Sequence, residues 1–256
     1  MQRADMPTAD VWLDEIFLSL QGEAGEVGRS QIFLRLGGCP LRCDYCDTPR
    51  SWQRGEHYER HDRDATTRGR NPLDAARLEA ELARVAASHG VDAREIPMAL
   101  TGGEPLEQVD FLAGWLPGWP APVMLETAGI WPERLARLLP YCAQVSLDWK
   151  LAGALRAGGE LAAAAECARL LHAAGSEGWV KIVVGDDVDE AELAGALDAL
   201  AAAAPGIRCF LQPATPVAGG PRAPSAGRLL AWSLASRRRQ LDLRVLPQVH
   251  PLMGAR

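Results

Sequence analysis

The chain contains the stretch Ile32-Phe33-Leu34-Arg35-Leu36-Gly37-Gly38-Cys39-Pro40-Leu41-Arg42-Cys43-Asp44-Tyr45-Cys46. Its first part, Ile32–Leu36, is apolar and ends at two glycines, which predicts a buried strand followed by a turn. Three cysteines then fall within eight positions, so three sulfur atoms lie on one short loop. Ligand sites of parallel sheets lie at the carboxyl ends of the strands, and we therefore expect a metal site on this loop.

Apolar runs and helical patterns alternate along the rest of the chain. The further strands that we expect are Ile96–Leu100, Val123–Glu126, Gln144–Leu147, Val180–Val184 and Arg208–Leu211. The helices expected between the strands are Pro72–His89, Leu106–Trp115, Trp131–Leu139, Leu161–Ala173 and Asp189–Ala204. Strands that alternate with helices predict βαβ units and a parallel sheet. The fold class is therefore α/β, and six such units would form a partial (β/α)6 barrel, short of the eight of a closed one.

Additional elements flank the predicted units. Val11–Leu20 is expected to be an extra N-terminal strand, and Leu241–Leu246 a strand after the last unit. The charged stretch Glu56–Arg70 predicts a surface loop or a mobile insertion. Pro72 suits the first turn of its helix, because the N–H that proline lacks has no partner there.

The chain of 256 residues is expected to form a single domain. Residues 1–30 would hold the N-terminal strand and a substrate loop, 31–216 the βα units, and 217–256 a helix, a strand and a tail.

Composition excludes several classes of protein. With 48% hydrophobic and 23% charged residues, the chain is not globally disordered. The net charge of −6 argues against binding through nucleic-acid phosphates. No apolar run reaches the roughly 18 residues of a membrane helix. Met1–Asp10 lacks the apolar segment of a signal peptide, so we expect a cytoplasmic protein without a membrane partner.

The three clustered cysteines admit two kinds of metal site. A structural zinc site needs a fourth protein ligand, for which His57 and His61 are the nearest histidines. An iron–sulfur cluster with three thiolates keeps one iron open for an outside ligand. The other cysteines, Cys142, Cys167 and Cys209, lie in apolar segments and are expected to pack in the core.

A second motif follows the next predicted strand. Thr101-Gly102-Gly103-Glu104-Pro105 comes directly after Met98-Ala99-Leu100. Two glycines allow close approach of the backbone to a ligand, and the Glu104 carboxylate can accept from an amino group.

The cysteine pattern C-x3-C-x2-C followed by Thr-Gly-Gly-Glu-Pro is similar to the radical S-adenosylmethionine superfamily. Within it, Ser19–Glu23, Ile32–Leu36 and Cys46-Asp47-Thr48 resemble the 7-carboxy-7-deazaguanine synthase family. Further agreement comes from Glu126–Gly129, Val145–Asp148, Lys181–Val184, Leu211–Pro213 and Leu246–His250. The resemblance implies a lyase of queuosine or 7-deazapurine biosynthesis. Its reaction contracts the ring of 6-carboxy-5,6,7,8-tetrahydropterin to 7-carboxy-7-deazaguanine, with loss of ammonia.

The resemblance also implies cofactors and site residues. Cys39, Cys43 and Cys46 would hold a 4Fe–4S cluster, and Thr48 a Mg²⁺ ion. The residues implied for binding S-adenosylmethionine are Tyr45, Cys46, Asp47, Gly102, Gly103, Glu104, Ser146, Leu147, Asp148 and Gln212. Those implied for the substrate are Leu20, Gln21, Gly22, Glu23, Arg35, Thr101 and His250.

Three of these residues have plain structural alternatives. Arg35 is a planar cation that suits a carboxylate, but it can also pair with a nearby acid such as Glu23. Thr48 can cap a helix, and His250 can be an ordinary structural histidine.

The partners implied by the resemblance are an electron donor such as flavodoxin or ferredoxin and a second copy in a homodimer. Two other functions stay open at this point. One is a radical S-adenosylmethionine activase that makes a glycyl radical on a partner enzyme, and the other is a non-enzymatic zinc or electron-carrier module.

Overall fold

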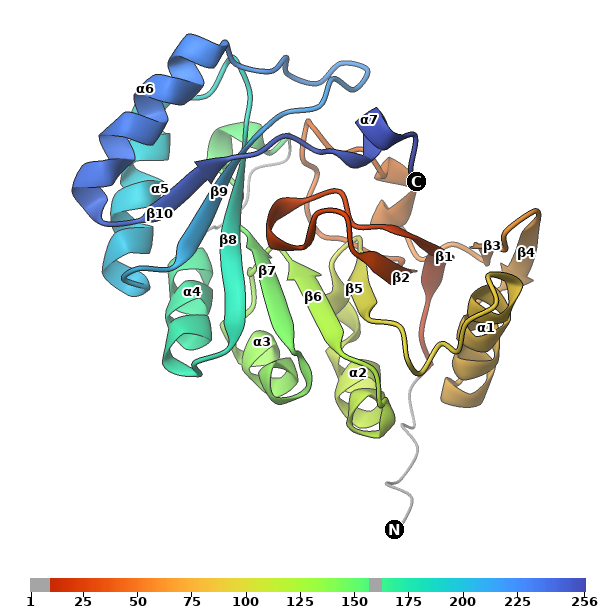
Figure 1. The fold of residues 1–256 in the computed structure, drawn as a ribbon. Coiled ribbons are helices and arrows are strands. Elements are labelled where there is room, and N and C mark those ends of the chain that lie inside the picture. The colour runs from red at the N-terminus through yellow and green to blue at the C-terminus, as the bar shows by residue number, and fades with distance from the viewer. Residues whose placement is uncertain (1–9, 157–162) are drawn as a thin grey trace.

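The computed structural model describes residues 10–156 and 163–256 (Figure 1). Its strands form one sheet in the order β10-β9-β8-β7-β6-β5-β2-β1-β3-β4. The strands are β1 (Leu13–Leu20), β2 (Ser30–Leu36), β3 (His57–His61), β4 (Thr66–Arg70), β5 (Met98–Gly102), β6 (Val123–Thr127), β7 (Gln144–Asp148), β8 (Glu177–Val184), β9 (Arg208–Pro213) and β10 (Asp242–Val245). The α-helices are α1 (Ala75–Ser88), α2 (Val109–Trp115), α3 (Pro132–Leu138), α4 (Ala163–Ala173), α5 (Glu190–Ala203), α6 (Ala226–Ser236) and α7 (His250–Met253).

The centre of the sheet is parallel. Strands β2, β5, β6, β7, β8 and β9 pair in that order, each parallel to the next. Strand β1 pairs antiparallel with β2, and β10 adds a parallel strand beside β9. Helices α1 to α6 lie around the outside of the curved sheet, whose ends β10 and β4 do not meet (Figure 1). The expected α/β fold with a partial barrel is confirmed.

The two faces of the sheet carry different side chains, because successive residues of a strand point to opposite sides. In β2, Ile32, Leu34 and Leu36 enter the main core beneath the helices. Phe33 and Arg35 point to the inner face instead, where Phe33 joins a second apolar cluster. The position of Arg35 therefore follows from the alternation of its own strand.

The inner face has an apolar floor and a polar ring. The floor consists of Phe17, Phe33, Ala99, Met124, Trp179 and Phe210, together with Ala24. Two residues further along each parallel strand stands a polar side chain that lines a cavity: Arg35, Thr101, Glu126, Asp148, Lys181 and Gln212. In β7, Ser146 replaces the apolar floor residue and accepts a hydrogen bond from Nε1 of Trp179, at 2.9 Å. Because the strands are parallel and in register, their polar residues meet at one edge.

The segment Glu56–Arg70 is a β-hairpin, so the expected loop is wrong. Strand β3 pairs parallel with β1, and β4 pairs antiparallel with β3. The charges that predicted a loop are matched inside the fold: the Arg60 guanidinium contacts Asp62 at 2.8 Å and Glu81 at 2.5 Å. Tyr58 is buried beneath Gly69, where a Cβ atom would lie 2.2 Å from its ring. Side-chain pairing thus lets a charged stretch extend the sheet.

Helix α1 begins later than expected, so the prediction that Pro72 occupies its first turn is wrong. Leu73 is still extended and exchanges two backbone hydrogen bonds with Val11. Asp74 then caps the helix by accepting from the N–H of Arg77 at 2.8 Å. The start of the helix expected at Leu161–Ala162 lies outside the described residues. Cys167 and Cys209 are buried as expected, whereas Cys142 is only partly buried at the margin of the core.

Within the described residues, no helix combines the length and the apolar character that crossing a membrane would require.

Candidate active site

One cavity gathers most of the residues singled out in the sequence. It opens at the carboxyl ends of the parallel strands, where the polar ring meets the loops. Its lining includes these expected residues: Leu20, Gln21, Gly22, Glu23, Arg35, Cys39, Cys43, Tyr45, Cys46, Asp47, Thr48, Thr101, Gly102, Gly103, Ser146, Asp148, Gln212 and His250. Glu104 and Leu147 are not in the lining. Leu147 points into the main core, because its neighbours Ser146 and Asp148 take the inner face.

Hydrogen bonds within the cysteine loop and to the segment around Ala154 hold the loop in place. Nη1 of Arg42 donates to the carbonyl oxygens of Cys39 at 2.6 Å and Leu41 at 2.7 Å. The N–H of Asp44 donates to the carbonyl of Ala154, and Cys43 forms an isolated bridge with Leu155. These contacts hold the backbone of the loop while its three thiols face the cavity.

The spacing of the three thiols favours a centre larger than one zinc ion. Among the described residues, one group of potential ligands has all its atoms within 4.8 Å of one another, and it is Glu15, Glu59 and His61. At least one pair of sulfur atoms among Cys39, Cys43 and Cys46 therefore lies more than 4.8 Å apart. Around a single zinc ion, with Zn–S bonds of about 2.3 Å, three sulfurs would lie closer together.

The thiols need a positive centre to become thiolates. Burial raises the pKa of Cys39 to about 12 and also raises the pKa of Cys43. A bound metal centre supplies the charge that deprotonates such thiols.

The Gly-Gly-Glu turn packs against the chain that leads into the cysteine loop, and its two glycines also line the cavity. Gly102 has a φ of 136°, and a Cβ atom on it would lie 2.3 Å from the backbone of Leu36. A Cβ atom on Gly103 would lie 2.1 Å from the carbonyl oxygen of Gly38. Both glycines are therefore needed so that the two loops can touch each other.

Glu104 holds this turn from inside the protein. Its carboxylate is 1% exposed and accepts hydrogen bonds from the N–H of Leu106, the hydroxyl of Thr127 and the N–H of Ala128. Burial raises the pKa of Glu104, and these hydrogen bonds oppose the rise. With its acceptors occupied in this way, Glu104 joins β5 to β6 and supports the rim of the cavity.

Four charged side chains in the lining of the cavity form a chain of ion pairs. Lys181 contacts Glu23 and lies 3.3 Å from Asp148, which in turn lies 2.6 Å from Lys150. Burial disfavours the charge of Glu23, but Lys181 outweighs it with the help of Gln248 and holds the pKa of Glu23 at about 2. Burial opposes the charges of both lysines too, but Asp148 outweighs it and raises their pKa values.

Two buried oxygen atoms beside this chain have no hydrogen-bond partner within the described part of the protein. They are the hydroxyl of Tyr45 and Oδ1 of Asp148. Both residues line the cavity beside the cysteine loop. Buried polar atoms normally have a hydrogen-bond partner, so a polar ligand bound there would supply the missing hydrogen bonds.

Gln21 and Glu126 work together at the centre of the cavity. The side-chain amide of Gln21 donates to Gln31 at 3.2 Å and to Glu126 at 2.9 Å, and its oxygen accepts from the backbone N–H groups of Gly22 and Glu23. Thr101 donates to the other oxygen of Glu126 at 2.8 Å. Gln21 is thus committed to shaping the loop, and it presents Glu126 to the cavity. Burial raises the pKa of Glu126, and nearby Glu23 adds to the rise.

Arg35 pairs with Glu15 of β1, not with Glu23. Its Nε atom lies 2.8 Å from Oε1 of Glu15. Glu23, which the sequence analysis named as a possible partner of Arg35, pairs with Lys181 instead. Arg35 lines the cavity as well, so the local acid does not remove it from the site.

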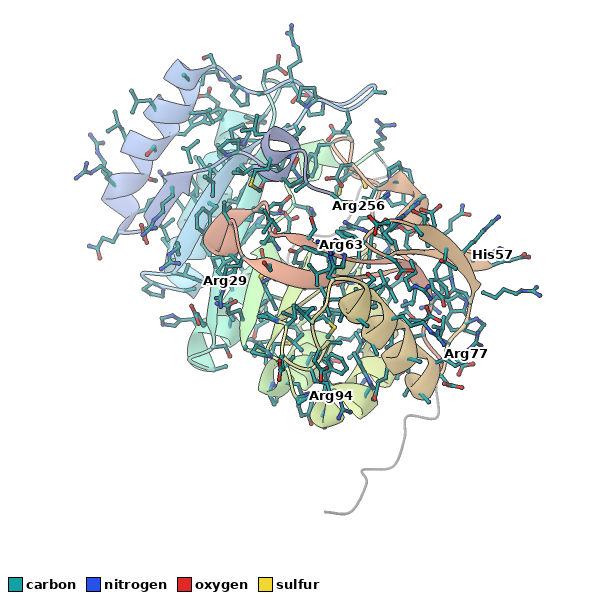
Figure 2. The ribbon with its side chains drawn as sticks, turned by 45° about the vertical axis from the view of Figure 1, so that its right-hand side comes forward. Arg29, His57, Arg63, Arg77, Arg94 and Arg256 are labelled. Atoms are coloured by element: carbon teal, nitrogen blue, oxygen red, sulfur yellow. The ribbon has the colours of Figure 1, made fainter. Side chains whose placement is uncertain are left out.

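The remaining predicted residues divide between cavity and scaffold. Thr48 lines the cavity and stands at the N-cap position of a short 3-10 helix, but its side chain does not cap that helix. His250 packs on Gly22, where a Cβ atom would lie 2.3 Å from its ring. Neither candidate fourth zinc ligand lines the cavity. Figure 2 shows His57 at the outer edge of the sheet, away from Arg256, and His61 binds Glu15.

Five lining residues with charged or amide side chains were not assigned to the site in the sequence analysis: Glu126, Lys150, Lys181, Gln248 and Arg256. Glu126 and Lys181 carried a usable signal. Each is a charge inside an apolar strand, two positions after an apolar residue of the inner floor, as Arg35 is. Gln248 and Arg256 carried no such strand pattern, because they belong to the segment after β10, which runs back past β9 and β8 to α7 (Figure 1).

Comparisons with known proteins extend over nearly the whole chain. No protein-family model matches the sequence. It is 32% identical over 252 residues to the 7-carboxy-7-deazaguanine synthase of Geobacter sulfurreducens, covering 94% of this chain and 96% of that protein. The 7-carboxy-7-deazaguanine synthase of Methanopyrus kandleri is 33% identical over 258 residues, covering 96% of this chain and 95% of that protein. The crystal structure of QueE from Escherichia coli has the same fold, with a TM-score of 0.55, 22% identity, and coverage of 92% and 94%.

Proposed function

The chain belongs to the 7-carboxy-7-deazaguanine synthase family, and from that premise we propose how its cavity serves the reaction. The reaction contracts the ring of 6-carboxy-5,6,7,8-tetrahydropterin to 7-carboxy-7-deazaguanine and releases ammonia. The observation that carries the proposal is that three thiols, the guanidinium of Arg35 and the half-buried carboxylate of Glu126 line one cavity at the carboxyl ends of the parallel strands.

We propose that the thiols of Cys39, Cys43 and Cys46 hold a 4Fe–4S cluster whose fourth iron binds S-adenosylmethionine. When bound, the cluster and S-adenosylmethionine supply a 5′-deoxyadenosyl radical that abstracts hydrogen from the substrate. The spread of the sulfur atoms and the two unpartnered oxygens of Tyr45 and Asp148 support this assignment.

The polar side chains around the chain of ion pairs that contains Lys181 and Lys150 would orient S-adenosylmethionine. Asp148 has one oxygen on Lys150 and the other without a partner among the described residues, so it can accept from ribose hydroxyls. Ser146 and Gln212 stand beside it on the neighbouring inner-face positions. Tyr45, Asp47, Gly102 and Gly103 would close the rest of this pocket, while Glu104 and Leu147 support it from behind.

The substrate would lie between Arg35 and Glu126. The amide-and-amino edge of a pterin is rich in N–H donors, which a carboxylate held by Gln21 and Thr101 accepts. The carboxyl group of the substrate needs a cation, and Arg35 is the inner-face guanidinium of β2. The loop Leu20–Glu23 and His250 would cover the ring and exclude water.

We propose that Thr48 contributes one ligand to a Mg²⁺ ion that also binds the substrate. Its side chain faces the cavity and is not used as a helix cap. Magnesium takes few protein ligands and keeps water and substrate oxygens, which suits one threonine. From the family resemblance we also propose a flavodoxin or ferredoxin as electron donor, and a homodimer.

The alternatives are less favoured. A glycyl-radical activase or a non-enzymatic metal module would not need a guanidinium and a carboxylate facing each other across a small cavity. Both sequence relatives compared above are named 7-carboxy-7-deazaguanine synthase, and their similarity to this chain extends over nearly their full length.

The test is an anaerobic assay of cluster-loaded protein with S-adenosylmethionine, a reductant, Mg²⁺ and 6-carboxytetrahydropterin. We expect 7-carboxy-7-deazaguanine by mass spectrometry, with no net consumption of S-adenosylmethionine. Omission of Mg²⁺ should slow turnover, and an unchanged rate would refute the proposed role of the ion. A brown protein that cleaves S-adenosylmethionine but leaves the pterin intact would refute the substrate, and a colourless zinc protein would refute the chemistry.

A further inference from the structure

We propose that Arg256 is a second carboxylate-binding residue of the cavity, which together with Arg35 selects the 6-carboxyl group of the substrate. The inference rests on the proposed function and adds a specificity-determining residue to it. It does not depend on the cluster or on S-adenosylmethionine. Four features of the structure support it.

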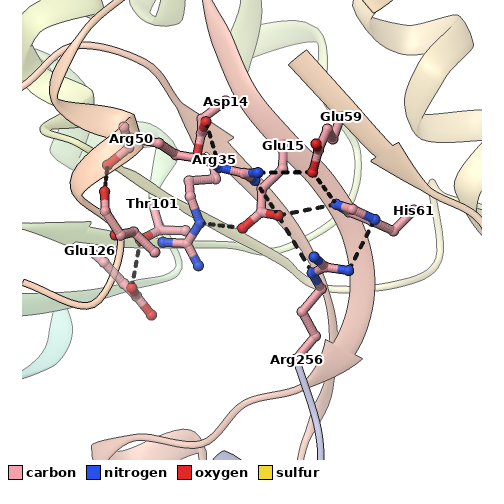
Figure 3. Close-up of polar contacts among 11 residues, drawn as sticks. Asp14, Glu15, Arg35, Arg50, Glu59, His61, Thr101, Glu126 and Arg256 are labelled. Carbon is pink, nitrogen blue, oxygen red and sulfur yellow. Dashed lines mark hydrogen bonds and ion pairs between the residues drawn. The ribbon is translucent and has the colours of Figure 1, made fainter. Parts of the chain in front are cut away.

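First, the two arginines flank one buried carboxylate. Nε of Arg35 lies 2.8 Å from Oε1 of Glu15, and Nε of Arg256 lies 3.5 Å from Oε2 of the same residue (Figure 3). Both guanidinium carbons lie 5.9 Å from the centre of the Phe17 ring. That ring is itself stacked on the ring of Phe33, with the ring centres 4.8 Å apart, so the two arginines share a stacked aromatic platform.

Second, His61 fixes the orientation of Arg256. Nη1 of Arg256 lies 3.0 Å from Nδ1 of His61. A guanidinium can only donate, so Nδ1 must accept and the ring proton sits on Nε2. That proton is donated to Oε2 of Glu15 at 3.2 Å. Burial and Arg256 both lower the pKa of His61, which agrees with a neutral ring in this role.

Third, the segment after β10 is anchored so that Arg256 reaches the cavity. The N–H of Val249 donates to the carbonyl of Gly22 at 2.8 Å, and Gln248 binds Glu23 and Asp47. After helix α7, Gly254 has a φ of 61°, which turns the chain back toward β1. Arg256 thereby lines the cavity on the same side as Arg35.

Fourth, both of these cavity-lining arginines keep guanidinium nitrogens that have no partner among the described residues. Of the three nitrogens of Arg35, only Nε has a partner among the described residues. Arg256 engages Nε and Nη1, and its Nη2 has no partner within the same part of the chain. A carboxylate complements these donors in charge, and both guanidinium groups keep N–H groups that can donate to it.

The same contacts argue against a metal ion at Glu15, Glu59 and His61, although these residues lie close enough together to hold one. Arg35, Arg50 and Arg256 all contact Glu15, and Arg50 also contacts Asp14 and Glu59. Three guanidinium groups already neutralise the three carboxylates of Asp14, Glu15 and Glu59, so little negative charge is left to attract a metal cation. The group serves to position the arginines.

The experiment measures binding of two pterins to the wild type and three variants under anaerobic conditions, by titration calorimetry. The ligands are 6-carboxytetrahydropterin and tetrahydropterin, which lacks the carboxyl group. For Arg256→Ala we expect the Kd of the carboxylated ligand to rise about tenfold or more, because a charge-assisted contact is lost. The Kd of tetrahydropterin should stay within about twofold. Arg256→Lys should show a smaller loss, since lysine keeps the charge but not the planar fork.

The matched control is Arg29→Ala. Arg29 has a side-chain exposure of 59%, close to the 51% of Arg256, and it also contacts a single carboxylate, Glu26, but it does not line the cavity. It should leave both Kd values unchanged. If Arg256→Ala weakens both pterins equally, or neither, the selective role of Arg256 is refuted. If the wild type binds neither pterin, the proposed function fails and this inference fails with it.

Discussion

Replacing Lys181 by methionine tests whether the buried chain of charges stabilises the protein. Lys181 is 7% exposed and contacts the carboxylates of both Glu23 and Asp148. Removing one member of a buried ion pair costs about 3–5 kcal/mol, because the partner is left charged and uncompensated. Here the lower end applies. Asp148 keeps Lys150 at 2.6 Å, and Glu23 keeps the side-chain amide of Gln248.

We therefore expect Lys181→Met to lower the free energy of unfolding by about 3 kcal/mol at pH 7. For a chain of this size that corresponds to a Tm lower by about 6–12 °C. Urea unfolding, followed by circular dichroism, measures the first quantity directly. Arg222→Met is the control. Arg222 pairs with Asp186 at 86% exposure, and its loss should cost no more than about 1 kcal/mol.

The difference in the free energy of unfolding between wild type and Lys181→Met should also depend on pH, which adds a second check. The pKa of Glu23 is about 2 in the folded protein and lies near 4.5 when the side chain is exposed. The unfolded state therefore takes up the proton first as the pH falls. The stabilisation from Glu23 is complete above pH 4.5 and is lost progressively toward pH 2. The gap between wild type and Lys181→Met should shrink over that range. Equal stability of the two proteins at pH 7, or a gap that widens in acid, would refute the reasoning.

Three further predictions concern the cavity and its support. Cys43→Ala should lose bound iron and the cleavage of S-adenosylmethionine, while circular dichroism shows that the fold is kept. The control is Cys167→Ala, which is buried outside the cavity and should retain iron. Iron retained by Cys43→Ala would contradict the ligand assignment. Glu104→Ala leaves two backbone N–H groups and one hydroxyl without their acceptor, so unfolding in urea should show a loss of about 3–6 kcal/mol, and a loss below about 1 kcal/mol would show that the turn does not need it. Glu126→Leu should weaken pterin binding at least about tenfold while leaving the affinity for S-adenosylmethionine unchanged, and titrations with each ligand alone can separate the two effects.

The sequence was sufficient for features that depend on neighbouring residues. The alternation in Ile32–Leu36 fixes which side chains enter the core, and it sends Arg35 to the opposite face. The same alternation in β6 and β8 places Glu126 and Lys181 on the same inner face, and a fuller use of the pattern would have found both. The cysteine loop and the Gly-Gly-Glu turn follow their strands directly, so parallel pairing brings them together.

The tertiary structure decided what depends on contacts between distant segments. Arg35 pairs with Glu15 rather than Glu23 because the register of β1 against β2 puts Glu15 opposite it. The hairpin at Glu56–Arg70 forms because β1 offers a free edge and because its charges find partners from other elements. Local sequence encodes periodicity and turn chemistry, whereas pairing partners depend on how separate segments pack. That is also why Arg256 reaches the cavity only through the path of the chain after β10.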